Sequence, residues 1–200
     1  PVTTIDADDA LQRFRYVKVE ATSFTISEPV ESLEISPLLY SEATQPQRQA
    51  LETNYEVKPF AIGTIKMERI FADKILAAEF YYQRRMLIDT SKHLYDLNTM
   101  MEQDRIQTLL STPEDLIKML AYKRREERER IGSDLAEKPF SDFQLFQSVD
   151  VDAELTAAFS KMQEIYVFSQ RDILSTAQLS VCMSELNQTL LKLDENLEMT

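Results

Sequence analysis

The stretch Met67-Glu-Arg-Ile-Phe-Ala-Asp-Lys-Ile-Leu-Ala-Ala-Glu-Phe-Tyr-Tyr-Gln-Arg84 decides the fold, because here an extended pattern gives way to a helical one. Its apolar residues recur at spacings of three and four and so share one face of an amphipathic helix: Ile70, Phe71, Ile75, Ala78 and Tyr82. Lys74 falls inside that apolar stripe. A lysine there must extend its ammonium to water, form an ion pair or bind a ligand.

A second stretch, Ser91-Lys-His-Leu-Tyr-Asp-Leu97, also places polar residues on a face that carries apolar ones. His93, the only histidine of the chain, and Asp96 are three residues apart, so on a helix they can touch or converge on one ligand. Taken singly, Lys74, His93 and Asp96 each fit an ordinary structural role. Taken together, they indicate a functional site.

Composition limits the function classes. Two hundred residues form one domain or two small ones, and 44% apolar residues suffice for a buried core. With 34 acidic against 22 basic residues the net charge is -12, which excludes a broad footprint for DNA or RNA but leaves room for a local basic groove. The single cysteine, Cys182, cannot form an internal disulfide, which fits a reducing compartment and a packing role.

The sequence contains neither an apolar run of about eighteen residues nor a charged-then-apolar leader, so we expect no membrane span, no signal peptide and a cytoplasmic location. The first residue is Pro1 rather than a methionine. We therefore expect that something upstream has been removed.

The N-terminal third reads as extended. Arg15 to Ile26 alternates as a strand does and holds Glu20 in its middle. Val30 to Tyr40 indicates a strand or short irregular segment, and Tyr55 to Ile65 an edge or bulged strand. The polar run Ser41 to Gln49 between them predicts a loop or short helix.

After Lys66 the pattern predicts helices over Met67–Arg84, Thr90–Leu109 and Pro113–Ile131, and glycine is scarce throughout the chain. The third helix begins at Pro113, with Thr112 as a hydroxyl cap, and Gly132 stops it.

Three later features each have a structural interpretation. The charge run Lys123–Arg130 predicts a solvated face with ion pairs at i,i+3 and i,i+4, with a basic patch near an active site as the alternative. Phe140, Phe143 and Phe146 predict core packing. The heptad-like seam from Leu179 to Leu197 closes the helical domain on itself, or alternatively seals a dimer.

Several chemistries are excluded by residue counts. One Cys and one His exclude Cys/His metal clusters, and two glycines exclude a Gly-rich phosphate loop. No nucleophile elbow is present. Asp6-Ala-Asp8 has the form of a D-x-D metal pair, but its polar surroundings favour a loop or frayed helix start.

In order and spacing, several motifs resemble the latter two-thirds of AbiEii-type nucleotidyltransferase toxins: Tyr16-Val-Lys-Val-Glu20, Glu28-Pro-Val30, Ile35-Ser36, Phe60-Ala-Ile-Gly-Thr-Ile65, Glu68-Arg-Ile-Phe-Ala-Asp-Lys74 and Ser91-Lys-His-Leu-Tyr-Asp-Leu97. The family's third motif is similar to E-R-T-x-x-E-K, which Glu68, Arg69 and Lys74 match. Its fourth is similar to R-H-x-Y-D-L, in which Lys92 replaces the arginine.

The resemblance implies an α+β fold. Residues 1–66 would be the C-terminal part of a nucleotidyltransferase α/β core, with the remnant of a mixed sheet, and residues 67–200 a mainly α-helical domain.

The resemblance also implies a function: metal-dependent transfer of a nucleoside monophosphate from an NTP to an acceptor, possible acceptors including RNA such as tRNA, by the toxin of a toxin–antitoxin system. Glu20 would be the third carboxylate of a Mg²⁺ site. Lys74 would contact the triphosphate, Arg69 and His93 would bind the nucleotide, and Asp96 would complete the catalytic set or orient Lys74. An antitoxin protein is a further implied partner.

The sequence departs from the family pattern in lacking the first two motifs, a glycine turn and an upstream D-x-D pair. We therefore expect this chain alone to be inactive and the activity to belong to a longer parent. Two alternatives remain: a non-catalytic binding or regulatory module, and a helical scaffold that dimerises through the seam ending at Leu197.

Overall fold

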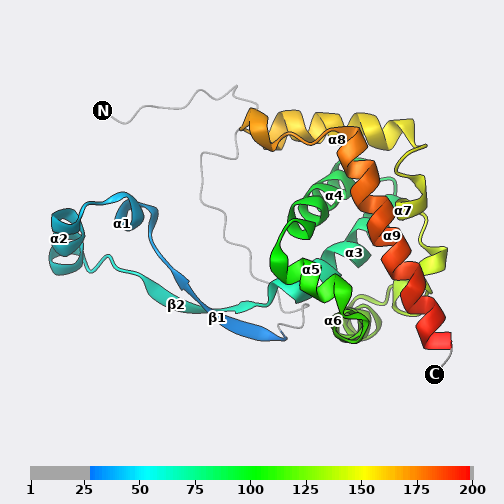
Figure 1. Ribbon diagram of the computed structural model, residues 1–200, viewed down its shortest axis with the longest axis horizontal. Helices are drawn as coiled ribbons and strands as arrows, with labels where there is room; N and C mark the ends of the chain where they lie inside the picture. Colours follow the sequence, from blue (N-terminus) through cyan, green and yellow to red (C-terminus); the bar gives the residue numbers. More distant parts are fainter. Residues whose placement is uncertain (1–27, 199–200) are drawn as a thin grey trace.

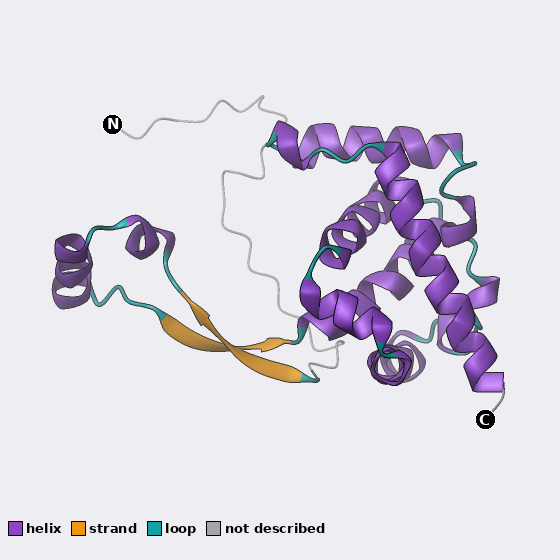
Figure 2. Cartoon of the chain, in the orientation of Figure 1, coloured by secondary structure: helices purple, strands orange, loops and turns teal. Residues whose placement is uncertain are grey.

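A two-stranded arm projects from a body of helices in the computed structural model, which describes residues 28–198 (Figure 1). The strands β1 (Val30–Ile35) and β2 (Phe60–Ile65) run antiparallel, with Ile35 opposite Phe60. No residue of either strand is buried. The described chain therefore has the predicted α+β composition, with its strands confined to the arm (Figure 2).

The tip of the arm is helical. The helices α1 (Leu38–Glu42) and α2 (Gln45–Tyr55) connect the two strands. The backbone N–H of Thr44 donates to the Gln47 side chain at 2.8 Å, which satisfies a free amide at the start of α2. The polar run predicted as a loop or short helix thus contributes to two helices.

The body consists of α3 (Met67–Gln83), α4 (Leu87–Met101), α5 (Asp104–Ser111), α6 (Pro113–Glu126), α7 (Leu145–Ser148), α8 (Ala153–Tyr166) and α9 (Thr176–Glu198). The helices α3 and α4 form an antiparallel pair at its centre. α6 packs against α3, α8 packs against α4, and α9 crosses α4 and α7 (Figure 1).

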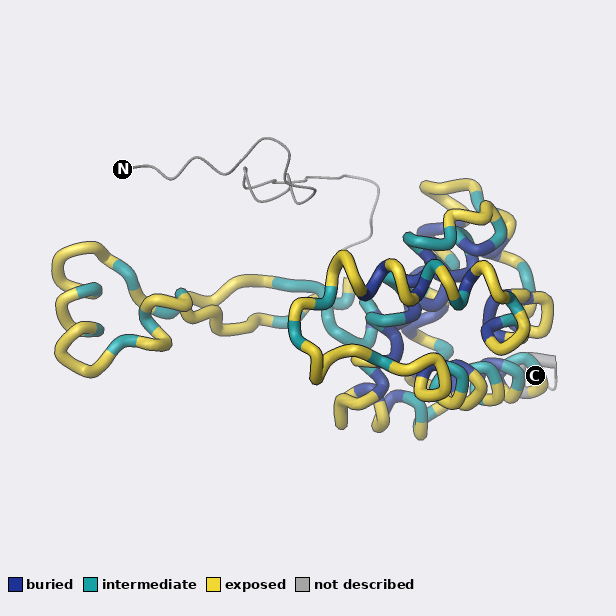
Figure 3. Tube along the Cα trace, turned by 90° about the horizontal axis from the view of Figure 1, so that it is seen from above, coloured by how far each residue is buried: buried dark blue, intermediate teal, exposed yellow. Residues whose placement is uncertain are grey.

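The apolar faces of these helices meet in one core, and the buried residues gather in the body rather than the arm (Figure 3). Phe71, Ile75 and Leu94 are fully buried there. Within residues 28–198, no helix combines the length and apolarity needed to cross a membrane.

Two of the three helix predictions are confirmed and one is wrong. The helix from Met67 and the start at Pro113 are confirmed, and the chain leaves the third helix at Gly132, whose φ of 71° is left-handed. The single helix predicted over Thr90–Leu109 is wrong, because the chain breaks between α4 and α5 at an extended Gln103. The break turns the apolar residues of α5 toward the core.

Two details of the third helix are also corrected. The Thr112 hydroxyl does not cap it but donates to the Thr108 carbonyl at 3.0 Å. The charge run is only partly solvated, because Lys123, Glu126 and Glu127 are buried where the helix continues into a π-helical turn, Glu127–Ile131. Lys123 pairs with Glu126 and Glu127, and Glu126 also pairs with Arg69 of α3.

The packing predictions are confirmed. Phe140, Phe143 and Phe146 are buried, and so are the described seam residues from Leu179 to Leu193, which pack within the chain. The strand predicted over Arg15 to Ile26 and the pair Asp6-Ala-Asp8 lie outside the described residues.

Candidate functional site

An ion pair joins the two central helices where the sequence places its misfit residues. Lys74 Nζ of α3 donates to Asp96 Oδ2 of α4 at 2.6 Å. The Lys74 side chain is 27% exposed and that of Asp96 43% exposed. The ammonium is therefore fixed in position by the carboxylate while part of its surface remains open to a ligand.

A pair of stacked rings also joins the two helices. Tyr81 of α3 and His93 of α4 stack with their centroids 5.3 Å apart and their planes 21° from parallel. Burial, and secondly the charge of Lys74, lowers the pKa of His93 to about 4. The imidazole is therefore neutral at neutral pH, and its buried Nδ1 has no hydrogen-bond partner within the described residues.

The residues Lys74, His93 and Asp96 thus share one region of the α3–α4 pair. The expected contact between His93 and Asp96 takes a different form, because Asp96 bonds Lys74 and His93 stacks on Tyr81. The fixed Lys74 ammonium can bind an anionic group of a ligand, and the neutral His93 ring beside it suits contact with a planar ring of the same ligand.

Arg69 lies elsewhere, between α3 and α6. Its side chain is fully buried, pairs with Asp73 on the same helix and donates from Nη2 to Glu126 Oε2 at 3.1 Å. Lys123 completes the network through Glu126 and Glu127, at 2.7 and 2.8 Å. A guanidinium without exposed surface meets a nucleotide only if α3 and α6 move apart.

The predicted metal ligand Glu20 lies outside the described residues. Within residues 28–198, no three side chains of His, Cys, Asp or Glu lie close enough together to hold a metal ion. The described residues therefore do not fit a Mg²⁺ site by themselves.

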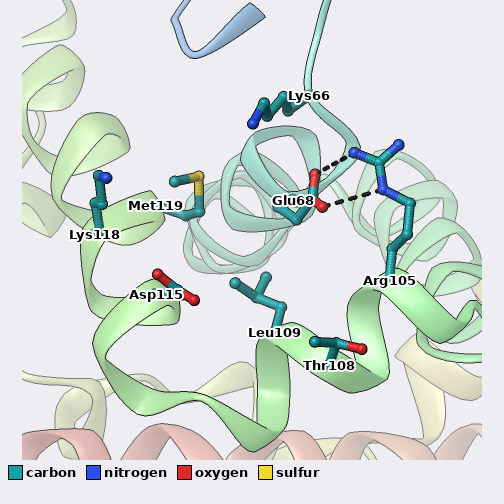
Figure 4. Close-up of a pocket in the computed structure, with 8 residues that line it drawn as sticks. All are labelled: Lys66, Glu68, Arg105, Thr108, Leu109, Asp115, Lys118 and Met119. Atoms are coloured by element: carbon teal, nitrogen blue, oxygen red, sulfur yellow. Dashed lines mark hydrogen bonds and ion pairs between the residues drawn. The ribbon is translucent and has the colours of Figure 1, made fainter. Parts of the chain in front are cut away.

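A pocket of about 240 Å³ lies where the arm joins the body, between α3, α5 and α6 (Figure 4). Glu68, a residue of the third motif, faces it and accepts two hydrogen bonds from Arg105, at 3.1 and 2.9 Å. Arg105 also donates to Glu31 of β1 at 3.0 and 3.1 Å. The sequence gives no signal for this pocket, because Glu31 and Arg105 are 74 residues apart and share no motif.

Comparison with known proteins agrees with the motif resemblance. A family model described as "Nucleotidyl transferase AbiEii toxin, Type IV TA system" matches residues 3–178, most of the 200-residue chain. No curated protein and no solved structure matches it. The matched region includes both helices that carry Lys74 and Asp96. The chain belongs to the AbiEii nucleotidyl transferase toxin family.

Proposed function

We propose that this protein transfers a nucleoside monophosphate from an NTP to an RNA acceptor such as tRNA, in a Mg²⁺-dependent reaction, and that an antitoxin controls it. The family supplies the class, a nucleotidyl transferase toxin of a type IV system. The observation that carries the proposal for this chain is the part-exposed Lys74–Asp96 pair beside the neutral His93.

In this proposal the Lys74 ammonium binds the triphosphate and stabilises the charge that develops on the leaving pyrophosphate. Asp96 holds Nζ in one place, so that little side-chain entropy is lost when the nucleotide binds. His93 borders the nucleotide without adding charge. Arg69 acts indirectly, since its buried pair with Glu126 fixes α3 against α6.

The Mg²⁺ part of the proposal depends on Glu20 and on carboxylates beyond residues 28–198. A bound Mg²⁺ would neutralise the phosphates and activate the attacking hydroxyl. The residues described here contribute the cation that meets the same phosphates from α3.

The test is transfer from each labelled NTP to total RNA by the protein in its full natural length, with Lys74→Ala and Asp96→Asn variants. We expect both variants to abolish transfer while the melting temperature stays nearly unchanged, because a part-exposed ion pair contributes at most about 1 kcal/mol to stability. Lys138→Ala is the matched control, since Lys138 forms an ion pair of similar exposure with Asp134. It should transfer normally.

Other results would favour a different function. Binding of NTP without transfer by the wild-type protein would favour the non-catalytic module. A large loss of stability in Lys74→Ala would indicate a structural role for the pair. The same assay on residues 1–200 alone tests the expectation that this chain is inactive by itself. The scaffold alternative is weakened, because the seam from Leu179 to Leu193 is covered within the chain.

A further inference from the structure

The pocket at the base of the arm is less acidic than the chain as a whole. Three cations line it, Lys66, Arg105 and Lys118, against two carboxylates, Glu68 and Asp115. Glu31 bonds Arg105 from beside the pocket and adds a third carboxylate, so positive and negative charges are equal here, whereas the whole chain has 22 basic and 34 acidic residues. A negatively charged ligand is therefore repelled less here than over the rest of an acidic surface.

Two of the cations are free to meet a ligand. Arg105 is engaged by both carboxylate oxygens of Glu68 and by those of Glu31. Lys66 and Lys118, by contrast, form no ion pair with any described residue. Figure 4 shows Lys66 at one end of the pocket and Lys118 on the α6 side, with the Glu68–Arg105 pair on the opposite side.

The pocket also has an apolar floor. Leu109 and Met119 lie between the charged groups, with only 4% and 9% of their surfaces exposed. An apolar floor with a few polar groups at its rim is typical of sites for small organic groups such as a nucleobase or ribose.

The hollow continues along α6. A second hollow of about 230 Å³ is lined by Lys118, Ala121, Tyr122 and Arg125, so the two share Lys118. Lys118, Tyr122 and Arg125 follow one another at spacings of four and three, which places them on one face of the helix. The Arg125 guanidinium lies 5.5 Å from the centre of the Tyr122 ring. Cations therefore extend over about 10 Å of this face, with an aromatic ring between them.

We infer that these two hollows form a binding track for single-stranded RNA. Lys66, Lys118 and Arg125 contact its phosphates, a nucleotide enters the pocket over Leu109 and Met119, and a base stacks on Tyr122. Because cations and ring extend beyond the first pocket, the track suits a strand better than a single free nucleotide. The inference rests on the proposed function for the identity of the strand as the acceptor.

Asp115 favours RNA over single-stranded DNA as the ligand. Its exposed carboxylate lines the pocket and would repel a phosphate placed against it. The same carboxylate can accept a hydrogen bond from a ribose 2′-hydroxyl, which DNA lacks. We therefore expect the track to prefer RNA over single-stranded DNA of the same sequence.

The track is separate from the proposed triphosphate site. Lys74 faces α4 and bonds Asp96, whereas Glu68 bonds Arg105 of α5 and the second hollow follows α6. Variants in the track should therefore change the binding of the acceptor and leave the contact to the nucleoside triphosphate intact.

The test is the affinity of the full-length protein for a fluorescent single-stranded RNA, measured by anisotropy between about 50 and about 200 mM salt. The double variant K66Q/K118Q should bind at least about tenfold more weakly at the lower salt, and its plot of log affinity against log salt should be shallower by about 0.7 for each lysine removed. Tyr122→Leu should weaken binding without changing that slope, because stacking releases no counterions.

The matched control is K161Q/K192Q, which removes two exposed lysines of α8 and α9 that form no ion pair with a described residue. It should bind RNA like the wild type. An equal loss in the control, or no salt-dependent binding by the wild type, would overturn the inference. So would displacement of the RNA from the wild type, but not from the double variant, by free NTP, since the pocket would then be a nucleotide site.

The RNA-binding and nucleotide-transfer experiments test the inference and the proposed function separately. RNA binding through the track without any nucleotide transfer would leave the inference intact and refute the proposed function. Nucleotide transfer to RNA that is as efficient in K66Q/K118Q as in the wild type would do the reverse.

Discussion

Arg69 carries a positive charge inside the molecule, and its partners decide what removing it does. Glu126, its bonded partner at 3.1 Å, is also buried, with a side chain only 1% exposed. We predict that Arg69→Met lowers the free energy of unfolding by about 3 kcal/mol, because Glu126 keeps its charge in the interior without the guanidinium that bonds it. Urea denaturation measures the change.

A control and a second variant separate charge from packing. Arg128→Met removes an arginine whose pair with Glu137 is largely exposed, so stability should stay nearly constant. The double variant Arg69→Met/Glu126→Gln should recover part of the loss, since the buried charge at position 126 is removed and only the part-exposed Asp73 loses its partner. If it is less stable than Arg69→Met alone, packing of the two side chains rather than charge explains the effect.

His93 links the site to pH. Its pKa of about 4 in the fold lies below the value of 6.5 in an unfolded chain, so the unfolded state binds the proton more readily. We therefore predict that stability falls as the pH drops from about 6.5 to about 4, and that His93→Gln loses less over the same interval.

The direct measurement is an NMR titration, in which the single histidine of the chain gives one set of ring signals. The midpoint should lie near the value of about 4 that burial imposes. A midpoint above 6 would show that the ring is solvated, and the argument for a neutral group beside Lys74 would fail.

At the scale of elements, Asp152 joins the start of α8 to the turn after α3. One carboxylate oxygen accepts the amides of Glu154 and Leu155, both at 3.0 Å. The other accepts from Tyr82 at 2.9 Å and from Arg85 at 2.7 Å. The Arg85 hydrogen bond, more than the others, lowers the pKa of Asp152 to about 2.

We predict that Asp152→Ala lowers the free energy of unfolding by about 1–2 kcal/mol, because α8 loses its N-cap. Asp152→Asn should cost less, since an amide oxygen still accepts the two backbone N–H groups. The contribution of the carboxylate is fully present above pH 3.8 and is lost as the pH falls through about 2. Chemical denaturation of both variants at neutral pH tests the ranking, and equal losses would assign the effect to the Arg85 pair.

The elements that the sequence predicts correctly are those whose signal is local. A wide apolar stripe fixes α3, and Gly132 supplies the left-handed residue at which the third helix ends. The break before α5 carries neither glycine nor proline, so periodicity runs through it. The burial of Lys123 and Glu126 depends on Arg69, which lies 57 residues before Glu126, and spacing within one helix cannot reveal such a partner.

At the scale of the whole molecule, the Lys74–Asp96 site has a local signal in the sequence, whereas the RNA track depends on contacts between distant segments. Lys74 and Asp96 stand out in the sequence because each interrupts an apolar face, and the α3–α4 pair brings them together. Of the proposed RNA track, only Arg125 belongs to a feature that the sequence singles out, the charge run Lys123–Arg130. The track forms only where α5 and α6 pack beside the base of the arm, and its lysines look like ordinary surface residues in the sequence.

The arm is the part of the described chain with the least burial against other elements. By the strand register, Leu33 lies opposite Ile62 and Ile35 opposite Phe60, so these four apolar side chains share one face of the ribbon. Each is between 43% and 53% exposed. A two-stranded ribbon with so little burial is marginally stable by itself.

We predict that the backbone amides of the arm exchange with deuterium much faster than those of the body. The informative comparison is between α2 and α8, since both are regular helices but only α8 contributes buried residues to the core. Exchange of a hydrogen-bonded amide requires local opening, which burial of apolar side chains opposes. Hydrogen exchange read by mass spectrometry should therefore show rapid labelling of α2 and of both strands, with slow labelling of α3, α4 and α8. Slow exchange in β1 and β2 would contradict this and would mean that, in solution, the apolar face of Leu33 and Phe60 is covered.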